Sequence, residues 1–301
     1  MAIPGLSIIG ERINPGFQST KAMFDNSDVP AIAELAKKQA DAGAKYLNLN
    51  IGTRALDDPE FMNEIIDAIQ AVVDIPLSFD FPNVAVQEIC LKKYDPAKAN
   101  GQKPIVNSIC ETRWDMLDLL GIQPFKIILM SSERVEDGVG LQNKTSAEMW
   151  ETTRRMVKAL LAEDHGLTTD DLIVDTAIGT LSSDTEGLMR ASLETVNLIN
   201  QDPDLKGIHM SGGLSNLSVQ LPSKEIEGAP MKLQLENAYL SLAVPNGFDM
   251  VLGTPWRAYE ILPEDNAVFG HFKEIIALDG TDALRRIRKM YKSGAQMTRR
   301  I

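Results

Sequence analysis

Four polar residues, two acids and two amides, each lie at the end of a short apolar run: Asp80, Asn107, Asp175 and Asn216. Polar residues at the carboxyl ends of the strands of a βα-repeat barrel converge on one pocket, because all such strand ends open at the same rim. None of the four is a nucleophile of the usual kind, and no basic side chain joins them. This combination favours hydrogen bonding to a polar heterocycle over covalent catalysis by a side chain.

The chemistry of each residue type fits the edge of a pterin or of a similar amide-like ring. The carboxylates of Asp80 and Asp175 can accept hydrogen bonds from amino and ring N–H groups. Asn107 offers a donor and an acceptor, which suits a mixed edge. Asn216 follows Gly212 and Gly213, and a glycine pair permits a tight backbone and the close approach of a ligand. Any of the four could instead cap a helix or order a loop, so the hypothesis rests on the set.

Eight apolar runs separated by segments of helical periodicity predict the elements that must position these residues. Runs that are apolar on both faces are typical of parallel strands buried between helices. The alternation of eight strands with helices predicts right-handed crossovers that close into a (β/α)8 TIM barrel. We expect residues 1–301 to form a single domain. The open doubly wound sheet is disfavoured because no GxGxxG follows the first run. The predicted strands are Leu6–Ile13, Lys45–Ile51, Pro76–Phe81, Pro104–Ile109, Phe125–Met130, Leu172–Ala177, Gly207–Met210 and Met250–Gly253.

Helix and loop signals refine this outline. Asp58 and Pro59 are typical of an N-cap and a first helical position. Helices are also predicted over Arg113–Leu120 and over Glu186–Ile199, the latter with Thr185 as its N-cap. Three connections are long for a barrel and follow strands five, seven and eight, where lids and partner-docking surfaces belong. They are Ser131–Thr145, Asn216–Pro230 and Thr254–Gly270.

Composition excludes several classes of function. The 301 residues carry 30 basic and 42 acidic side chains, a net charge of −12, which argues against binding to nucleic acid or to an anionic membrane. The two cysteines and three histidines show no metal-site spacing, so no bound metal is expected. No signal peptide or membrane-spanning run is evident, and a cytoplasmic location is expected. No GxSxG or P-loop is present.

Several charged residues near the expected rim have a structural or a functional interpretation. Glu11 and Arg12 are expected to pair near the end of the first strand. Lys224 and Arg257 lie in rim loops, where each could meet a ligand carboxylate or be a solvated charge. His209 lies inside the seventh predicted strand and is expected to have no chemical role.

Short phrases along nearly the whole chain resemble those of the methyltetrahydrofolate:corrinoid-protein methyltransferases, within the pterin-binding TIM-barrel superfamily. One phrase alone is weak, but their order on consecutive predicted strands makes the resemblance strong. The phrases are Ile9-Gly10-Glu11-Arg12-Ile13-Asn14, Leu47-Asn48-Leu49-Asn50-Ile51-Gly52, Phe79-Asp80 with Asn83, Val106-Asn107-Ser108, Val174-Asp175, and Gly213-Leu214-Ser215-Asn216-Leu217-Ser218.

The resemblance implies an enzyme that transfers a methyl group between N5 of methyltetrahydrofolate and the cobalt of a corrinoid (cobalamin) on a separate protein. The direction could also run from methyl-corrinoid to tetrahydrofolate, in anaerobic one-carbon or demethylation metabolism. Members are usually homodimers. Asn216 would reach N5 as the catalytic residue. The substrate-binding set would be Asp80, Asn107, Asp175, Gly213, Ser215, Asn83, Glu11 and Asn50.

Three departures from the family pattern bear on this expectation. Asn48 stands where an aspartate is common, and Val219 where an aromatic residue or glutamine is common. The insert Ser131–Thr145 is longer than expected. The alternatives are a non-catalytic folate-binding or scaffold subunit, and a dihydropteroate synthase-like enzyme, whose basic pyrophosphate-binding phrases are missing here.

Overall fold

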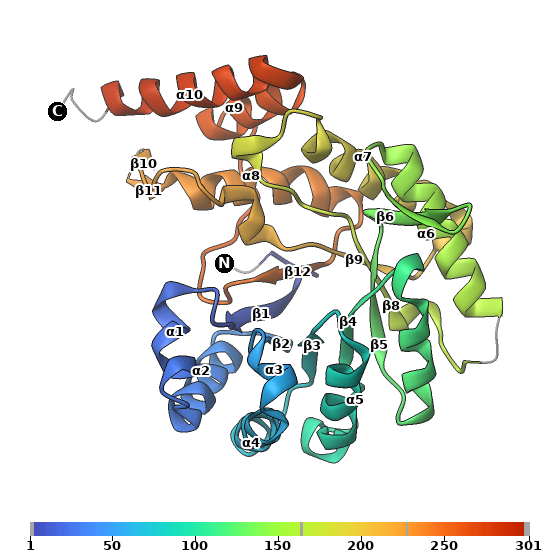
Figure 1. Cartoon of the computed structure of the whole chain (residues 1–301). Coiled ribbons are helices and arrows are strands. Elements are labelled where there is room, and N and C mark those ends of the chain that lie inside the picture. Colours follow the sequence, from blue (N-terminus) through green and yellow to red (C-terminus); the bar gives the residue numbers. More distant parts are fainter. Residues whose placement is uncertain (1–2, 163–164, 227, 298–301) are drawn as a thin grey trace.

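A ring of eight parallel strands lies at the centre of the molecule (Figure 1). The computed structural model describes residues 3–162, 165–226 and 228–297. The strands follow one another in the order β12-β1-β2-β3-β4-β5-β8-β9. A bridge between Gly213 and Leu252, with Leu252 N donating to Gly212 O at 3.1 Å, brings the end of β9 to β12. The predicted (β/α)8 barrel is therefore confirmed. The strands are β1 (Ser7–Ile13), β2 (Tyr46–Leu49), β3 (Leu77–Asp80), β4 (Ile105–Ile109), β5 (Lys126–Met130), β8 (Leu172–Asp175), β9 (His209–Ser211) and β12 (Met250–Gly253).

Helices cover the outside of this ring (Figure 1). Asp58 accepts a hydrogen bond from Phe61 N at 3.1 Å, with Pro59 as the first helical residue, so α4 begins as its sequence predicts. The α-helices are α1 (Gln18–Asp25), α2 (Val29–Asp41), α3 (Arg54–Asp57), α4 (Pro59–Gln70), α5 (Val84–Lys93), α6 (Ser146–Ala162), α7 (Leu188–Gln201), α8 (Met231–Ala243), α9 (Ala267–Ile276) and α10 (Gly280–Met297). None of the described helices is long and apolar enough to cross a membrane.

The core consists of two separate apolar clusters. The larger cluster lies between the strands and the surrounding helices. The smaller one lies among the inward-facing side chains of the strands and contains Ile9, Ile105, Ile128, Ile173 and Met250. The centre of the barrel is therefore packed with side chains, and a ligand must bind at a rim.

Two predicted helices differ from the structure. Arg113–Leu120 lies within a 3₁₀ segment, Glu111–Gly121, because Arg113 has non-helical dihedrals (φ −132°, ψ 44°) that interrupt the α-helical path. The helix predicted to follow Thr185 begins at Leu188. Its N-cap residue is Gly187, and the Asp184 carboxylate accepts from the amides of Leu188 and Met189 at 2.9 Å each.

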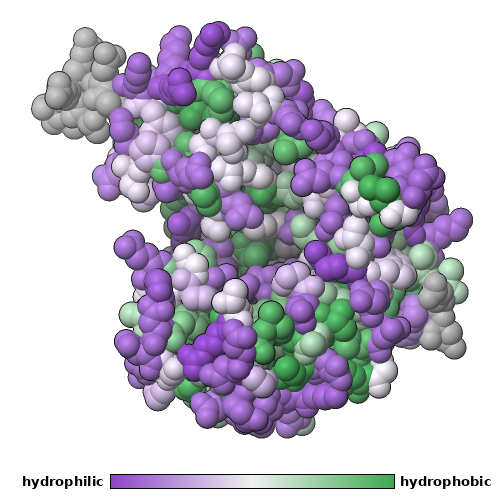
Figure 2. Space-filling model, viewed as in Figure 1, coloured by the Kyte–Doolittle hydropathy of each residue, from purple (hydrophilic) through white to green (hydrophobic). Residues whose placement is uncertain are grey.

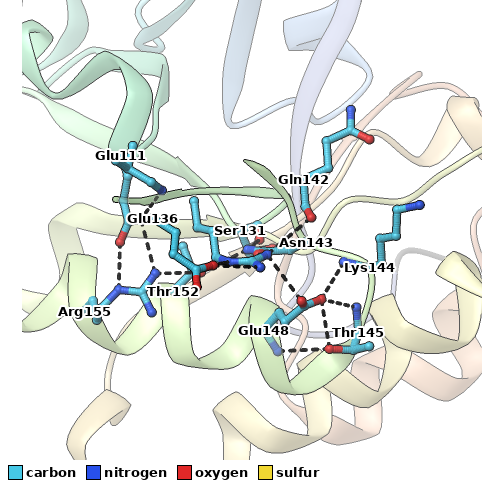
Figure 3. Close-up of polar contacts among 12 residues, drawn as sticks. Glu111, Ser131, Glu136, Gln142, Asn143, Lys144, Thr145, Glu148, Thr152 and Arg155 are labelled. Atoms are coloured by element: carbon cyan, nitrogen blue, oxygen red, sulfur yellow. Dashed lines mark hydrogen bonds and ion pairs between the residues drawn. The ribbon is translucent and has the colours of Figure 1, made fainter. Parts of the chain in front are cut away.

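The insert after β5 is an antiparallel hairpin of β6 (Glu133–Glu136) and β7 (Val139–Gln142). Its base is fixed by a polar network (Figure 3). Glu111 accepts from Val135 N at 2.7 Å and from Arg155 Nε at 3.0 Å, while Asn143 Nδ2 donates to Ser131 O at 2.7 Å. The long connection after β9 likewise contains a 3₁₀ turn, η6 (Leu214–Ser218), and a short hairpin of β10 (Glu225–Ile226) and β11 (Ala229–Pro230).

His209 joins two strands at the amino end of the barrel. Its Nδ1 lies 2.6 Å from Asp249 Oδ2, and its Nε2 lies 3.2 Å from Asp170 Oδ1. Asp249 Oδ1 also accepts from Met210 N at 3.0 Å. The hydrogen bond to Asp249 is the main cause of a raised pKa for His209. His209 therefore has a structural role, linking the start of β9 to the residue before β12.

We expect the stabilising effect of His209 to be largest at low pH. A histidine whose folded-state pKa is raised contributes stability that is fully present below its unfolded pKa of roughly 6.5 and is lost as pH rises through the folded pKa. Urea unfolding of the wild type and of His209→Gln at pH 6 and pH 9 would measure this effect. The wild type should exceed the variant in unfolding free energy by more at pH 6. A difference that does not change with pH would contradict this role.

Candidate functional site

A cavity of about 350 Å³ opens at the carboxyl ends of the strands. The face shown in Figure 2 is hollowed near its centre, over the ring of strands. Three predicted residues that lie on strands, Asp80 on β3, Asn107 on β4 and Asp175 on β8, line it together with Asn216. The other lining residues are Glu11, Asn14, Phe17, Asn48, Ser108, Met130, Gly213, Ser215 and Leu252.

The floor of this cavity follows from the two-residue period of the strands. Successive side chains of a strand point to opposite faces, so a residue two positions beyond an inward-facing one also points inward. Each apolar residue of the inner cluster is followed in this way by a lining residue one layer nearer the rim. The pairs are Ile9 and Glu11, Ile105 and Asn107, Ile128 and Met130, Ile173 and Asp175, and Met250 and Leu252.

One wall of the cavity is a chain of amides ending on Asp80. Asn48 Nδ2 donates to Asp80 Oδ2 at 3.0 Å, and Asn107 Nδ2 lies 3.5 Å from Asn48 Oδ1. Burial raises the pKa of Asp80, and the hydrogen bond from Asn48 opposes that shift. Asn48 thus fixes the orientation of this carboxylate and leaves its other oxygen for a ligand.

Asp175 is the second carboxylate of the cavity. Its Oδ1 accepts a hydrogen bond from Ala177 N at 2.7 Å. Burial, together with the negative charge of Asp80, raises the pKa of Asp175 to about 6, against the lowering effect of that backbone hydrogen bond. Among the described residues that line the cavity there is no lysine or arginine. The two carboxylates therefore lack a cationic partner, and a ligand rich in N–H donors would complement them.

Asn216 lies within η6, on the segment that connects β9 to α8. A side chain at Gly213 would place its Cβ 2.7 Å from Asn216 Nδ2, so only glycine leaves the amide in its present position. The neighbouring Ser215 Oγ donates to Glu11 Oε2 at 2.8 Å, and Thr254 Oγ1 donates to Glu11 Oε1 at 2.7 Å. Burial raises the pKa of Glu11, and these two hydrogen bonds oppose the shift.

Two expected ligand residues have other roles. Asn50 Nδ2 donates to the main-chain oxygen of Asp80 at 3.0 Å, and its Oδ1 accepts from Gly52 N at 2.7 Å. Asn83 is the N-cap of α5, with its Oδ1 accepting from Val86 N at 3.2 Å. Neither residue lines the cavity, because each side chain is engaged with the backbone. Both residues hold the loop that follows β3, and their contact with a substrate stays a prediction.

The charged residues singled out near the rim also differ from expectation. Glu11 binds Ser215 and Thr254 rather than pairing with Arg12, whose guanidinium stacks 3.9 Å from the centre of the Phe17 ring. Adjacent strand residues point to opposite faces, which explains the separation of Glu11 from Arg12.

Lys224 and Arg257 are likewise committed within the protein. Lys224 Nζ donates to Tyr291 O at 2.9 Å, and Arg257 forms an ion pair with Glu236. Neither cation therefore lines the cavity as a free ligand for a carboxylate.

Sequence reasoning treated Asn48 only as a lost carboxylate and did not place it in the pocket. Its position two residues after the inward-facing Tyr46 could have shown that it faces inward. No such periodicity marks Asn14 and Phe17, which follow β1 in an irregular segment, or Ser108, which lies in β4 where the strand register shifts.

We expect Asp80→Asn to lower the pKa of Asp175, because the substitution removes the nearest negative charge. The pKa of Asp175 should still stay above the ordinary range of an aspartate, since burial is the largest cause of its upward shift. Titration of the Asp175 carboxyl by ¹³C NMR would measure the change. Asp57→Asn, in the exposed α3, is the control and should leave the titration unchanged. An Asp175 pKa identical in wild type and Asp80→Asn would disprove the coupling.

Comparison with known proteins places the chain in a family. The model of the pterin binding enzyme family matches residues 11–252. A methylcorrinoid:tetrahydrofolate methyltransferase of Eubacterium limosum is 27% identical over 293 residues, covering 95% of this chain and 96% of that protein.

Solved dihydropteroate synthases share the fold. The enzyme from Clostridium difficile, solved with pteroic acid, has a TM-score of 0.58 and 20% identity, over 95% of this chain and 97% of that one. The enzyme from Vibrio fischeri has a TM-score of 0.54 and 14% identity, over 95% and 93%. Because the family model spans β1 to β12, including every strand that lines the cavity, the chain belongs to the pterin-binding enzyme family.

Proposed function

We propose that this protein transfers a methyl group between N5 of tetrahydrofolate and the cobalt of a corrinoid that is held on a separate protein. The observation that carries the proposal is one cavity containing two carboxylates without a cationic partner, the amide of Asn107, and the amide of Asn216 beside Gly213. The name of the Eubacterium limosum relative, methylcorrinoid:tetrahydrofolate methyltransferase, favours the direction from methyl-corrinoid to tetrahydrofolate.

The cavity suits the pterin ring in size and in polarity. About 350 Å³ falls in the range of small-molecule pockets. The ring N–H and exocyclic amino groups would donate to Asp80 and Asp175, and Asn107 would meet an edge that has both a donor and an acceptor. Met130 and Leu252 give the lining its apolar surface, against which the flat ring can pack.

Asn216 would act on the charge at N5. The corrinoid partner supplies a strong cobalt nucleophile for the methyl group, or the methyl group itself in the other direction. A methyl on a tertiary amine leaves only if N5 is protonated or polarised. The Asn216 carbonyl can accept from a protonated N5 and its amide can donate to an unprotonated one, whereas the proton itself comes from solvent. One preorganised group of this kind is worth a few kcal/mol.

The partners follow from the same proposal. The corrinoid protein would approach the rim at which the cavity opens, among the connections that follow β5, β9 and β12. We also propose that the enzyme works as a homodimer, as the family resemblance implies.

Asn216→Ala should lower methyl transfer by roughly 10²–10³-fold, because one transition-state hydrogen bond is lost, while folate still binds. The assay follows cobalt absorbance with methyltetrahydrofolate and chemically reduced cobalamin, and with methylcobalamin and tetrahydrofolate in reverse. Gly213→Ala should displace the Asn216 amide and approach the same loss. Asn246→Ala, near the amino end of β12, is the control. Normal turnover of Asn216→Ala would remove Asn216 from the mechanism.

Folate binding should weaken as the pH falls through 6, because the ionised Asp175 accepts charge-assisted hydrogen bonds, whereas protonation removes the charge and leaves an O–H donor facing the N–H groups of the ligand. A pKa of about 6 leaves roughly a tenth of the carboxyl ionised at pH 5, so the dissociation constant should rise about tenfold between pH 7 and pH 5. Asp175→Asn should bind folate weakly at pH 7 and show a smaller pH dependence. Calorimetry at both pH values measures this, and unchanged affinity in Asp175→Asn would exclude Asp175 as a ring ligand.

A further inference from the structure

The short turn that carries Asn216 is held by two buried carboxylates. Ser215 Oγ donates to Glu11 Oε2 at 2.8 Å, and Ser218 Oγ donates to Glu236 Oε1 at 3.0 Å. Residues at i and i+3 of a 3₁₀ helix eclipse one another, so both hydroxyls lie on one side of η6. Asn216 lies between them in the sequence and lines the cavity. The two serines therefore fix the rotation of η6, and with it the direction of the Asn216 side chain.

Burying an ionised carboxylate at the position of Glu236 is unfavourable in free energy. Its side chain is fully buried on α8, where an ionised carboxylate loses its hydration. One oxygen accepts from Ser218, and the other is paired with the guanidinium of Arg257, whose side chain remains 33% exposed. A buried ion pair adds little net stability compared with apolar residues of the same volume, whereas the loss of one partner is strongly destabilising. Such a pair is therefore better suited to fixing a geometry than to raising stability.

The two carboxylates are linked through Arg257. Burial raises the pKa of Glu11, whereas the hydrogen bonds from Thr254 and Ser215 and the charge of Arg257 lower it. Arg257 thus interacts with the acid at each end of η6. It lies in the segment after β12, Glu236 lies on α8, and Glu11 lies on β1, so three separate parts of the barrel meet beneath the turn.

We propose that the Glu236–Arg257 ion pair is a positioning element for Asn216 and acts through the hydroxyl of Ser218. The inference deepens the proposed function and rests on it. Glu236 does not line the cavity, so its effect on the reaction must pass through η6. The pair holds the Asn216 amide in the orientation that N5 requires, although neither of its members lines the cavity.

Each variant that tests this inference removes one interaction between η6, Glu236 and Arg257. Ser218→Ala deletes only the hydroxyl that joins η6 to Glu236. Glu236→Gln keeps the shape of the side chain and removes the charge that faces Arg257. Ser241→Ala, on the same helix, is the matched control. Its hydroxyl is also buried and hydrogen-bonded, to Asn237 O at 2.7 Å, but it does not contact η6.

Two measurements then separate positioning from a general structural effect. Small misplacements of a catalytic group can reduce rates by up to roughly 10²-fold. Ser218→Ala should lower kcat about tenfold or more and change the folate dissociation constant by less than about twofold. In the Asn216→Ala background the same substitution should have no further effect on kcat. An equal loss in both backgrounds, or no loss in either, would overturn the inference.

The second measurement does not depend on activity. The side-chain amide resonance of Asn216, identified in ¹⁵N-asparagine-labelled protein by its absence from Asn216→Ala, should shift in Ser218→Ala and in Glu236→Gln. It should stay in place in Ser241→Ala. A resonance that does not move in Ser218→Ala overturns the inference, even if Glu236→Gln fails to fold. A resonance that moves in a protein without methyl-transfer activity supports the positioning role and overturns the proposed function instead.

Discussion

The two-residue period of strands closed into a barrel is the constraint on which the rest of this structure depends. Once Ile9, Ile105, Ile128 and Ile173 point into the barrel, the residues two positions later must point inward as well, one layer nearer the rim. The first layer is apolar because it is sealed on all sides. The next layer can be polar because it faces an opening. The cavity is therefore a direct consequence of strand geometry, and Asp80, Asn107 and Asp175 are held by hydrogen-bonded strand backbone.

This placement has an electrostatic consequence. Asp80 and Asp175 line the same cavity, and burial is the first cause of the raised pKa of each. Asn48 orients Asp80 without adding charge. An aspartate there would have placed a third carboxylate against the other two and raised the free energy of the ionised site further. The two carboxylates of the site can accept more hydrogen bonds than the protein donates to them. A ligand with N–H groups would supply the missing donors.

The segment that carries Asn216 follows a different principle. It is a short 3₁₀ turn, and such turns have weaker internal hydrogen bonding than α-helices. Its position depends on side chains from β1, α8 and the segment after β12. Gly213 adds a steric requirement, since a larger residue would displace the Asn216 amide. The strands form the floor of the cavity, where Asp80, Asn107 and Asp175 would bind the ligand. The turn held by carboxylates would place the Asn216 amide accurately over that ligand.

The sequence by itself determined the barrel, the pocket-lining role of Asp80, Asn107, Asp175 and Asn216, and the place of Gly213 beside the last of these. It could do so because strand period, strand length and the order of elements are local properties that a single chain displays. It did not show that Asn50 and Asn83 bind backbone, that Glu11 meets Ser215 and Thr254, or that Asp184, not Thr185, accepts from the first amides of α7.

Only the tertiary structure decided these contacts, because each depends on competition between partners that are far apart in the sequence. Glu11 lies 204 residues from Ser215, and Arg257 reaches a carboxylate on a helix that the sequence alone describes as an ordinary one. The types of residue that could do chemistry are set locally. Which of them face the ligand, and which hold the others in place, is set by the closure of the barrel, which brings the first strand against the last.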